Sequence, residues 1–306
     1  MASRTALGDW SLLVFCNLIW ASQFVMVKLV QVQLGPIAAT LLPMTLATIL
    51  LVPIVLHERS KNARAARRWQ AAGQFVLLGL FGQVVAQLCI TWGMRFASAS
   101  NAALLFLTLP VITAVMARVI LREHMTRIRW IAFTLAIVGA AACSGIDWST
   151  VSLTGSNAAL GTGLVLLSIC GSAFYNVYSK RLLESYSPLE VLLYSYFAVL
   201  GFLFPIAWAL EPAAYSQLSG LTSTTLAGIG VLAVFQYSIS MVAFLAVLRR
   251  LNANQAALGN YLIPFFGLVI AALFLGERLQ WPMIVGGMLV LASTVLATLG
   301  DKESSS

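Results

Sequence analysis

The sequence predicts an all-α polytopic membrane protein with ten transmembrane helices, arranged as two inverted five-helix repeats. Three observations predict this fold: the apolar composition, the number of long apolar runs, and a segment that occurs twice. Of the 306 residues, 60% are hydrophobic and only 9% are charged, whereas a soluble domain carries roughly 25% charged residues. This number of charged residues is too small to cover the surface of a globule of this size in water. We therefore expect the lipid bilayer to surround the chain.

The apolar runs predict the helices in order. A spanning helix needs roughly 20 predominantly apolar residues, and about ten runs approach that length. They lie near residues 10–30, 36–56, 71–92, 101–121, 130–145, 160–180, 189–209, 226–248, 254–276 and 282–299. The polar stretch DWSTVSLTGSN separates the fifth run from the sixth. We therefore expect a first five-helix repeat over 1–146, a connecting loop over 147–158, a second repeat over 159–300 and a disordered tail over 301–306.

The net charge of +8 reflects the loops and does not indicate nucleic-acid binding. Most Lys and Arg residues fall in alternate short loops, above all in the HERSKNARAARR segment after the second run. Because basic loops stay in the cytoplasm, we expect both termini there. The N-terminal run resembles a signal peptide, but no clear small-residue cleavage site follows it, so we expect a retained helix.

The repeat appears in two stretches, NAALLFLTLPVITAVMARVILREH and QAALGNYLIPFFGLVIAALFLGER. Their alignment places Pro110 on Pro264. In addition, WASQFVMVK in the first run aligns with SAFYNVYSK in the sixth, which places Ala21 on Ala173. Five helices in each half force the second half to enter the membrane from the opposite side. Inverted repeats of this kind are typical of secondary transporters, in which a substrate site near the midplane opens alternately to each side.

Pro110 and Pro264 are the candidate hinges. Neither can donate a backbone hydrogen bond, so the carbonyls of Phe106 and Asn260 lose a partner. A carbonyl without a partner must face protein or a water-filled cavity. We expect each proline to kink its helix beside the substrate pathway; a kink that serves packing alone is the alternative.

Polar side chains inside apolar runs are the candidate substrate contacts, because such groups avoid lipid and point inward. They come from both halves: Gln23, Gln83, Gln87, Tyr175, Asn176, Tyr178, Gln236, Tyr237, Asn260 and Tyr261. Each is equally suited to join two helices by a hydrogen bond, but together they predict a polar cavity with aromatic walls. The second repeated stretch has Asn260 and Tyr261 where the first is apolar, so we expect it to make more of the substrate contacts. Trp20 and Trp92 lie nearer the ends of their runs. Each could belong to the interfacial aromatic belt or could gate the pathway.

No Asp or Glu lies in the middle of an apolar run, and a buried carboxylate is the usual element of a proton relay. The expected cavity therefore suits neutral or zwitterionic molecules, such as apolar amino acids, better than polycations. His57 and His124 lie in loops, and the sequence contains no recognisable nucleophile–base pair, so we do not expect an enzyme. The cysteines lie in apolar runs without metal-ligand spacing, so we expect no metal site and no cofactor.

Four charged residues at helix ends form two candidate pairs. With both termini in the cytoplasm, Lys28 and Glu277 lie on the outer side, and Lys180 and Glu123 lie on the inner side. Each pair joins the two repeats, so we expect the pairs to brace or gate the two faces. In the alternative, the lysines extend to the membrane interface and each glutamate pairs with a neighbouring arginine.

The two repeated stretches and the segment IWASQFVMVK resemble the signature segments of the drug/metabolite transporter superfamily, EamA type. The resemblance implies ten helices in two inverted repeats and export of small metabolites across the bacterial inner membrane. Within that family the chain looks closest to the aromatic amino acid exporters. We therefore expect a secondary transporter that exports aromatic or other neutral amino acids, or related small metabolites, by alternating access. A complete two-repeat fold can do so as a monomer.

Other functions stay open at this point. A carrier of sugars or nucleotide sugars, or a multidrug exporter, would share the architecture, but nucleotide phosphates require cations that the mid-membrane positions lack. A membrane enzyme would present a cluster of carboxylates, histidines or metal ligands at one face. A gated channel built from several subunits would not need inverted repeats, whereas a pore within one subunit could contain them.

Overall fold

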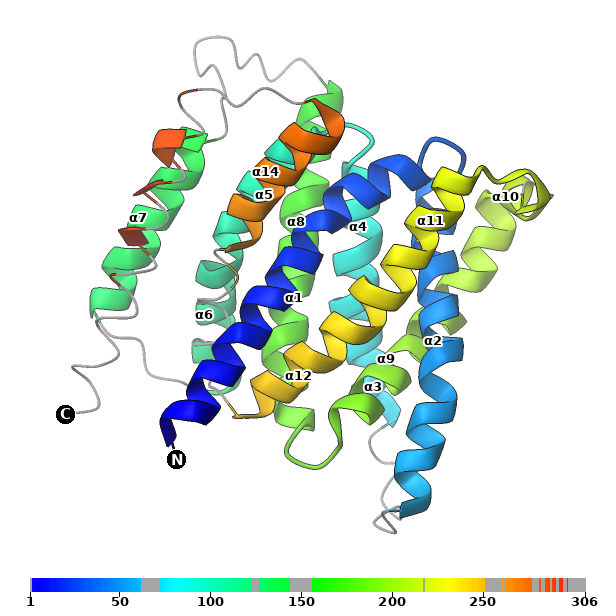
Figure 1. Ribbon diagram of the computed structural model, residues 1–306, viewed down its shortest axis with the longest axis horizontal. Coiled ribbons are helices and arrows are strands. Elements are labelled where there is room, and N and C mark those ends of the chain that lie inside the picture. The colour runs from blue at the N-terminus through cyan, green and yellow to red at the C-terminus, as the bar shows by residue number, and fades with distance from the viewer. Residues whose placement is uncertain are drawn as a thin grey trace.

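The computed structural model describes residues 2–61, 72–122, 127–143, 156–216, 218–250, 260 and 262–276, with a few further positions between 281 and 296. Within these residues every regular element is helical (Figure 1), as the sequence predicts. In this part of the chain, 6 helices are long and apolar enough to cross a membrane, and shorter apolar helices accompany them. Glu123, Tyr261, Glu277, most of the connecting loop and the tail lie outside the described residues.

The elements follow one another in this order: α1 (Ala2–Val30), α2 (Pro36–Lys61), α3 (Ala72–Leu77), η2 (Leu78–Val84), α4 (Val85–Gly93), α5 (Ala99–Leu105), η3 (Phe106–Thr108), α6 (Leu109–Ile120), α7 (Arg127–Cys143), α8 (Ser156–Leu182), α9 (Pro188–Leu210), α10 (Pro212–Ser216), η4 (Leu218–Gly220), α11 (Ser223–Val231), η5 (Leu232–Ser240), α12 (Met241–Arg250) and α14 (Leu262–Leu275). η2 and η5 are π-helical, whereas η3 and η4 are 3-10 turns. α3, η2 and α4 form one continuous span, and α11, η5 and α12 form another.

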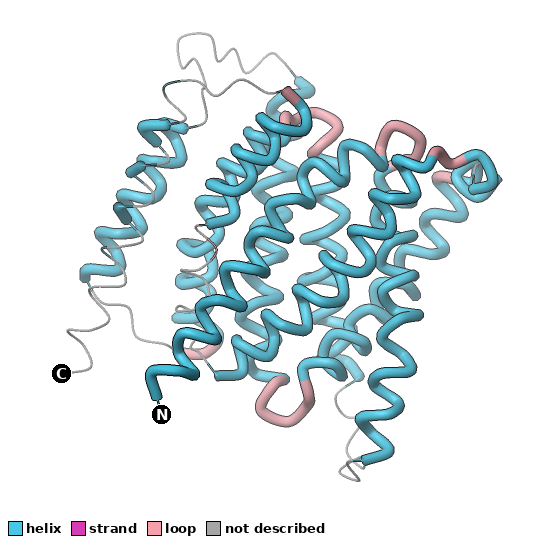
Figure 2. The backbone as a smooth tube through the Cα atoms, in the orientation of Figure 1, coloured by secondary structure: helices cyan, strands magenta, loops and turns pink. Residues whose placement is uncertain are grey.

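The first helix of each half packs against the other half. α1 packs against α11, η5, α12 and α14, and α8 packs against η2, α4 and α6. Figure 1 shows α1 in front, with α14 on one side and α11 and α12 on the other, while α7 lies at one edge of the bundle. Short turns connect the helices at both ends (Figure 2). This exchange of first helices places both halves around the centre of the bundle.

The outer surface is apolar and the polar side chains lie inside. On α9, Phe197, Phe204 and Trp208 are 50%, 53% and 65% exposed, whereas the amide side chains of Gln23 and Gln83 are buried. A bilayer requires this arrangement, because lipid cannot satisfy polar groups. The fold therefore supports the predicted polytopic membrane protein.

Carboxylates tie α2 to α9 at both ends. At the start of α2, the Glu211 carboxylate accepts hydrogen bonds from the backbone nitrogens of Ile37 and Ala38, at 3.1 and 2.8 Å. At the other end, the Ser187 hydroxyl before α9 donates to Glu58 Oε2 of α2 at 3.0 Å. A negative charge at a helix N-terminus compensates the unpaired N–H groups there. The two carboxylates therefore fix how α2 lies along α9.

Gly35 is required for the contact with Glu211, because a Cβ at this position would collide with the carboxylate. We expect Gly35→Ala to displace Glu211, break both hydrogen bonds to α2 and lower the free energy of unfolding by about 1–2 kcal/mol, as the loss of an N-cap does. The thermal midpoint of the purified protein in detergent measures this. The control is Gly201→Ala in α9, where a Cβ has no atom within 4 Å. Equal midpoints for the two variants would show that the Glu211 contact does not matter.

Candidate functional site

A cavity lies where the two halves meet in the middle of the bundle. Side chains of α1, η2, α4, η3 and α6 line it from the first half, and those of α8, η5, α12 and α14 line it from the second. The space open to the centre of a water-sized sphere is about 50 Å³, which accommodates a few water molecules. Among the described residues that line this cavity, none carries a charge.

Most of the predicted substrate contacts line this cavity: Gln23, Gln83, Gln87, Tyr175, Asn176 and Gln236. Tyr237 lies directly behind it, because its hydroxyl donates to Gln87 Oε1 at 3.3 Å. Tyr178 instead stacks on Phe174, with 5.2 Å between ring centroids, and does not line the cavity. Asn260 is fully buried but is not a lining residue, and Tyr261 lies outside the described residues.

Three glutamines form a chain of hydrogen bonds between the halves. Gln236 Nε2 of η5 donates to Gln23 Oε1 of α1 at 2.8 Å. Gln23 Nε2 donates in turn to Gln87 Oε1 of α4 at 2.7 Å, and it also approaches the Tyr237 hydroxyl at 3.4 Å. The chain has a direction, because each amide donates to the next, and Gln23 is its central member.

Several polar atoms at the cavity make no hydrogen bond within the described part of the chain. They are Gln83 Nε2, Gln83 Oε1, Gln236 Oε1 and the Tyr175 hydroxyl. All three side chains are buried, with 1%, 4% and 3% exposure for Gln83, Gln236 and Tyr175. Buried polar groups normally have partners, so this wall of the cavity is suited to bind a molecule that supplies donors and acceptors.

Aromatic side chains form the rest of the wall. The Trp20 indole nitrogen donates to Ser240 Oγ at 3.0 Å, and its ring packs against Phe244 with 4.8 Å between centroids. Phe24 of α1 meets Phe106 of η3 edge to face at 5.4 Å. Trp20 therefore lines the cavity, whereas Trp92 is 39% exposed and does not.

The repeat alignment relates the lining residues of one half to those of the other. It places Trp20 on Ser172, Gln23 on Tyr175 and Phe24 on Asn176. All of these line the cavity. Sequence reasoning missed Phe24 and Ser172 because they are not unusual in an apolar run. For Phe24, its alignment with the predicted Asn176 was a usable signal.

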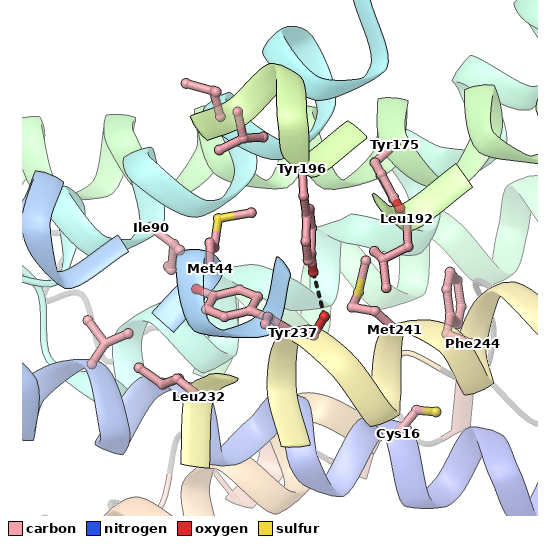
Figure 3. Packing of buried hydrophobic residues seen from close by; sticks show 14 of the residues in the cluster. Cys16, Met44, Ile90, Tyr175, Leu192, Tyr196, Leu232, Tyr237, Met241 and Phe244 are labelled. Atoms are coloured by element: carbon pink, nitrogen blue, oxygen red, sulfur yellow. Dashed lines mark hydrogen bonds between the residues drawn. The ribbon is translucent and has the colours of Figure 1, made fainter. Parts of the chain in front are cut away.

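The two π-helices correspond in the same way. The alignment of Pro110 with Pro264 places Leu78 on Leu232, which are the first residues of η2 and η5. Beside η5, the Tyr196 hydroxyl of α9 donates to the Tyr237 carbonyl at 2.7 Å (Figure 3). π-Helical turns inside α-helices often mark functional sites, and these two flank the cavity from both sides.

One hydrogen bond occurs twice, once beside each π-helix. Cys16 Sγ of α1 donates to the Ser240 carbonyl at 3.3 Å, and Ser168 Oγ of α8 donates to the Ala86 carbonyl at 2.7 Å. The alignment places Cys16 on Ser168 and Ala86 on Ser240. Donor and acceptor thus occupy equivalent positions in the two halves.

The candidate hinge Pro110 lies next to a change of helix type. The helix predicted over 101–121 changes its type: α5 ends at Leu105, a 3-10 turn follows with helical dihedral angles, and α6 begins at Leu109 with Pro110 in its first turn. The first turn tolerates proline because its N–H groups have no helical partner. Pro264 likewise lies near the start of the described α14. A 3-10 turn thus lies beside Pro110 in an otherwise helical run, and the hinge role of both prolines stays a prediction.

Neither predicted charge pair can be examined in the structure, because Glu123 and Glu277 both lie outside the described residues. Lys180 Nζ donates to the Leu248 carbonyl at 2.7 Å, near the C-terminal end of α12, where a positive charge is favourable. The two pairs stay predictions, and Lys180 has a defined role in joining α8 to α12.

The sequence pattern of the EamA-like transporter family matches residues 9–145 and 159–299. A probable terminal-alkyne amino-acid exporter of Streptantibioticus cattleyicolor is 27% identical over 302 residues, which cover 97% of this chain and 96% of the relative. An uncharacterized transporter of Archaeoglobus fulgidus is 25% identical over 92% of this chain and 95% of its own length. A solved crystal structure at 13% identity matches with a TM-score of 0.74 over 98% of this chain and 99% of that chain, which shows a shared fold.

Proposed function

We infer that this chain, which belongs to the EamA-like transporter family, exports neutral amino acids, aromatic or other, or closely related small metabolites. The family membership confirms the predicted family and a transporter rather than an enzyme. The relative from Streptantibioticus cattleyicolor is described as an amino-acid exporter, which agrees with this substrate class. The observation that carries the proposal is a cavity between the two halves with amide and aromatic walls.

The chemistry of the cavity supports a net-neutral substrate. A molecule with a net charge would lose its hydration there without gaining an opposite charge among the described lining residues, and that loss is costly. A zwitterion has no net charge, and its two ends can bind amide donors and acceptors. The aromatic rings of Trp20, Phe24 and Phe106 suit an apolar side chain.

We propose alternating access between two inverted five-helix repeats, residues 1–146 and 159–300, as the mechanism. The equivalent π-helices and the hydrogen bond that occurs on both sides support such a symmetry. Room for only a few water molecules means that the two halves must separate before a whole amino acid can enter. Pro110, next to the 3-10 turn, and Pro264, near the start of the described α14, are the candidate hinges.

We further propose a bacterial inner membrane location with cytoplasmic termini. The basic residues at the ends of α8 and α12, namely Lys180, Arg181, Arg249 and Arg250, support this orientation. In Figure 1 these helix ends lie toward the same end of the bundle as the start of α1. A monomer contains the complete cavity, so a partner is not needed to form it.

Transport by the purified protein in liposomes tests the function. We expect uptake of one or more labelled neutral amino acids above the level of protein-free liposomes, with aromatic amino acids as the best competitors. Because no carboxylate lies in the middle of an apolar run, we expect less than a twofold change when a pH gradient is imposed. No flux of any amino acid would overturn the substrate class, and strong stimulation by the gradient would overturn uncoupled transport.

A further inference from the structure

We propose that Gln83 binds the α-ammonium and α-carboxylate groups of the substrate together through its single side-chain amide, and that Gln236 Oε1 is a second acceptor for the ammonium. The proposal rests on the proposed function and deepens it, since it assigns the residues that recognise an α-amino acid. Both glutamines line the cavity.

Gln83 is the most unusual side chain in the cavity. It is 1% exposed, and neither Nε2 nor Oε1 makes a hydrogen bond of standard geometry within the described residues, although the amide lies near the Tyr175 hydroxyl. A buried amide without partners is costly, and a packing role alone would be served better by leucine. The chain therefore keeps at this position a buried donor and acceptor that make no hydrogen bond of standard geometry within the described residues.

The shape of the amide fits the head of an α-amino acid. A primary amide presents one acceptor and one donor side by side, since oxygen and nitrogen share one carbon. A zwitterionic α-amino acid presents an ammonium donor and a carboxylate acceptor on either side of its Cα. Two hydrogen bonds can therefore form in parallel, Nε2 to the carboxylate and the ammonium to Oε1, and hydrogen bonds to charged groups are the stronger kind.

The glutamine chain determines which atom Gln236 offers. Its Nε2 is held by Gln23 Oε1 at 2.8 Å, and Gln23 Nε2 is held by Gln87 Oε1 at 2.7 Å. If the Gln236 amide alone were reversed, two oxygens would face each other across the first of these bonds, so the orientation of Gln236 is coupled to that of Gln23 and Gln87. Gln236 Oε1 is thus left as a buried acceptor without a partner, suited to an ammonium hydrogen.

The substrate then has one orientation. Its head lies at Gln83 and Gln236, and its side chain extends toward Trp20, Phe24 and Phe106. The α-amino acid methyl ester is a cation and the N-acetyl amino acid is an anion, so each lacks one of the two charged ends and carries a net charge. We expect both analogues to compete at least tenfold more weakly than the parent amino acid.

Gln83→Leu tests the assignment, with Gln74→Leu as the matched control. Gln74 belongs to the same span but does not line the cavity. We expect Gln83→Leu to raise the KM for the amino acid tenfold or more, with a smaller change in kcat, and to reduce the preference over the ester and the N-acetyl analogue at least threefold relative to the wild type. Gln83→Asn keeps the amide and should restore part of the preference. Size-exclusion profiles and thermal midpoints establish that each variant is folded.

The outcomes separate this proposal from the proposed function. If the wild type transports amino acids and Gln83→Leu keeps the same preference among the three compounds, the assignment to Gln83 is wrong and the function stands. If the wild type transports none of them, the function itself is wrong. If Gln83→Leu does not fold, Gln83→Asn and Gln236→Leu decide: unchanged preference in both variants overturns the proposal, and a reduced preference in either supports it.

Discussion

Gln23→Leu is expected to reduce transport at least tenfold, the largest effect of any single substitution among the lining residues. Gln23 accepts from Gln236 Nε2 and donates to Gln87 Oε1, so its removal breaks the chain in the middle. Each buried group left without a partner costs about 1–3 kcal/mol. We therefore expect the initial rate of amino-acid uptake in liposomes and the thermal midpoint of the protein to fall together.

A double-mutant cycle shows whether the loss comes from the broken chain. Gln236→Leu alone leaves Gln23 Oε1 unpaired, whereas the double substitution removes both partners of that bond. We expect the double variant to lose less stability than the sum of the two single variants, because leaving one partner unpaired costs more than removing both. Strictly additive losses would mean that the chain does not act as a unit.

The site could be predicted from the sequence where a polar residue interrupts an apolar run. Gln23, Gln83 and Gln236 were recognisable because an amide inside a membrane needs a protected place, and the structure brings all three to one cavity. Phe24 and Phe106 carried no such signal. A phenylalanine that faces a cavity looks the same in sequence as one that faces lipid.

The membrane fold was predictable from composition and the length of the apolar runs, but the helix interiors were not. η2 and η5 differ from an α-helix only in which carbonyl each N–H contacts, and composition does not record that choice. Close packing is a better guide: a Cβ on Gly82 in η2 would lie 3.0 Å from the Tyr175 ring.

Gly171→Ala is the second substitution expected to have a large effect, and its direction opposes helix propensity. In an ordinary helix interior, alanine is more favourable than glycine by about 1 kcal/mol. At Gly171 of α8, however, a Cβ would lie 2.6 Å from the Ala86 nitrogen and 3.0 Å from the Gly82 oxygen. Both are backbone atoms and cannot rotate aside, so α8 would have to move away from η2 and α4. We expect a loss of about 1–3 kcal/mol in stability, the range for overpacking a core.

Gly163→Ala in the same helix is the matched control, because a Cβ there has no atom within 4 Å. It should leave the thermal midpoint unchanged or raise it, while Gly171→Ala should lower both the midpoint and the rate of uptake. A Gly171→Ala variant as stable as Gly163→Ala would contradict the close approach of α8 to α4. The aligned position in α1 is Ile19, a large side chain, so α1 cannot approach η5 and α12 in the same way. The contact of α8 with η2 and α4 and the contact of α1 with η5 and α12 are therefore equivalent in the repeat but packed differently. We expect Ile19→Ala to lower stability because it leaves a cavity, whereas Gly171→Ala lowers it through a collision.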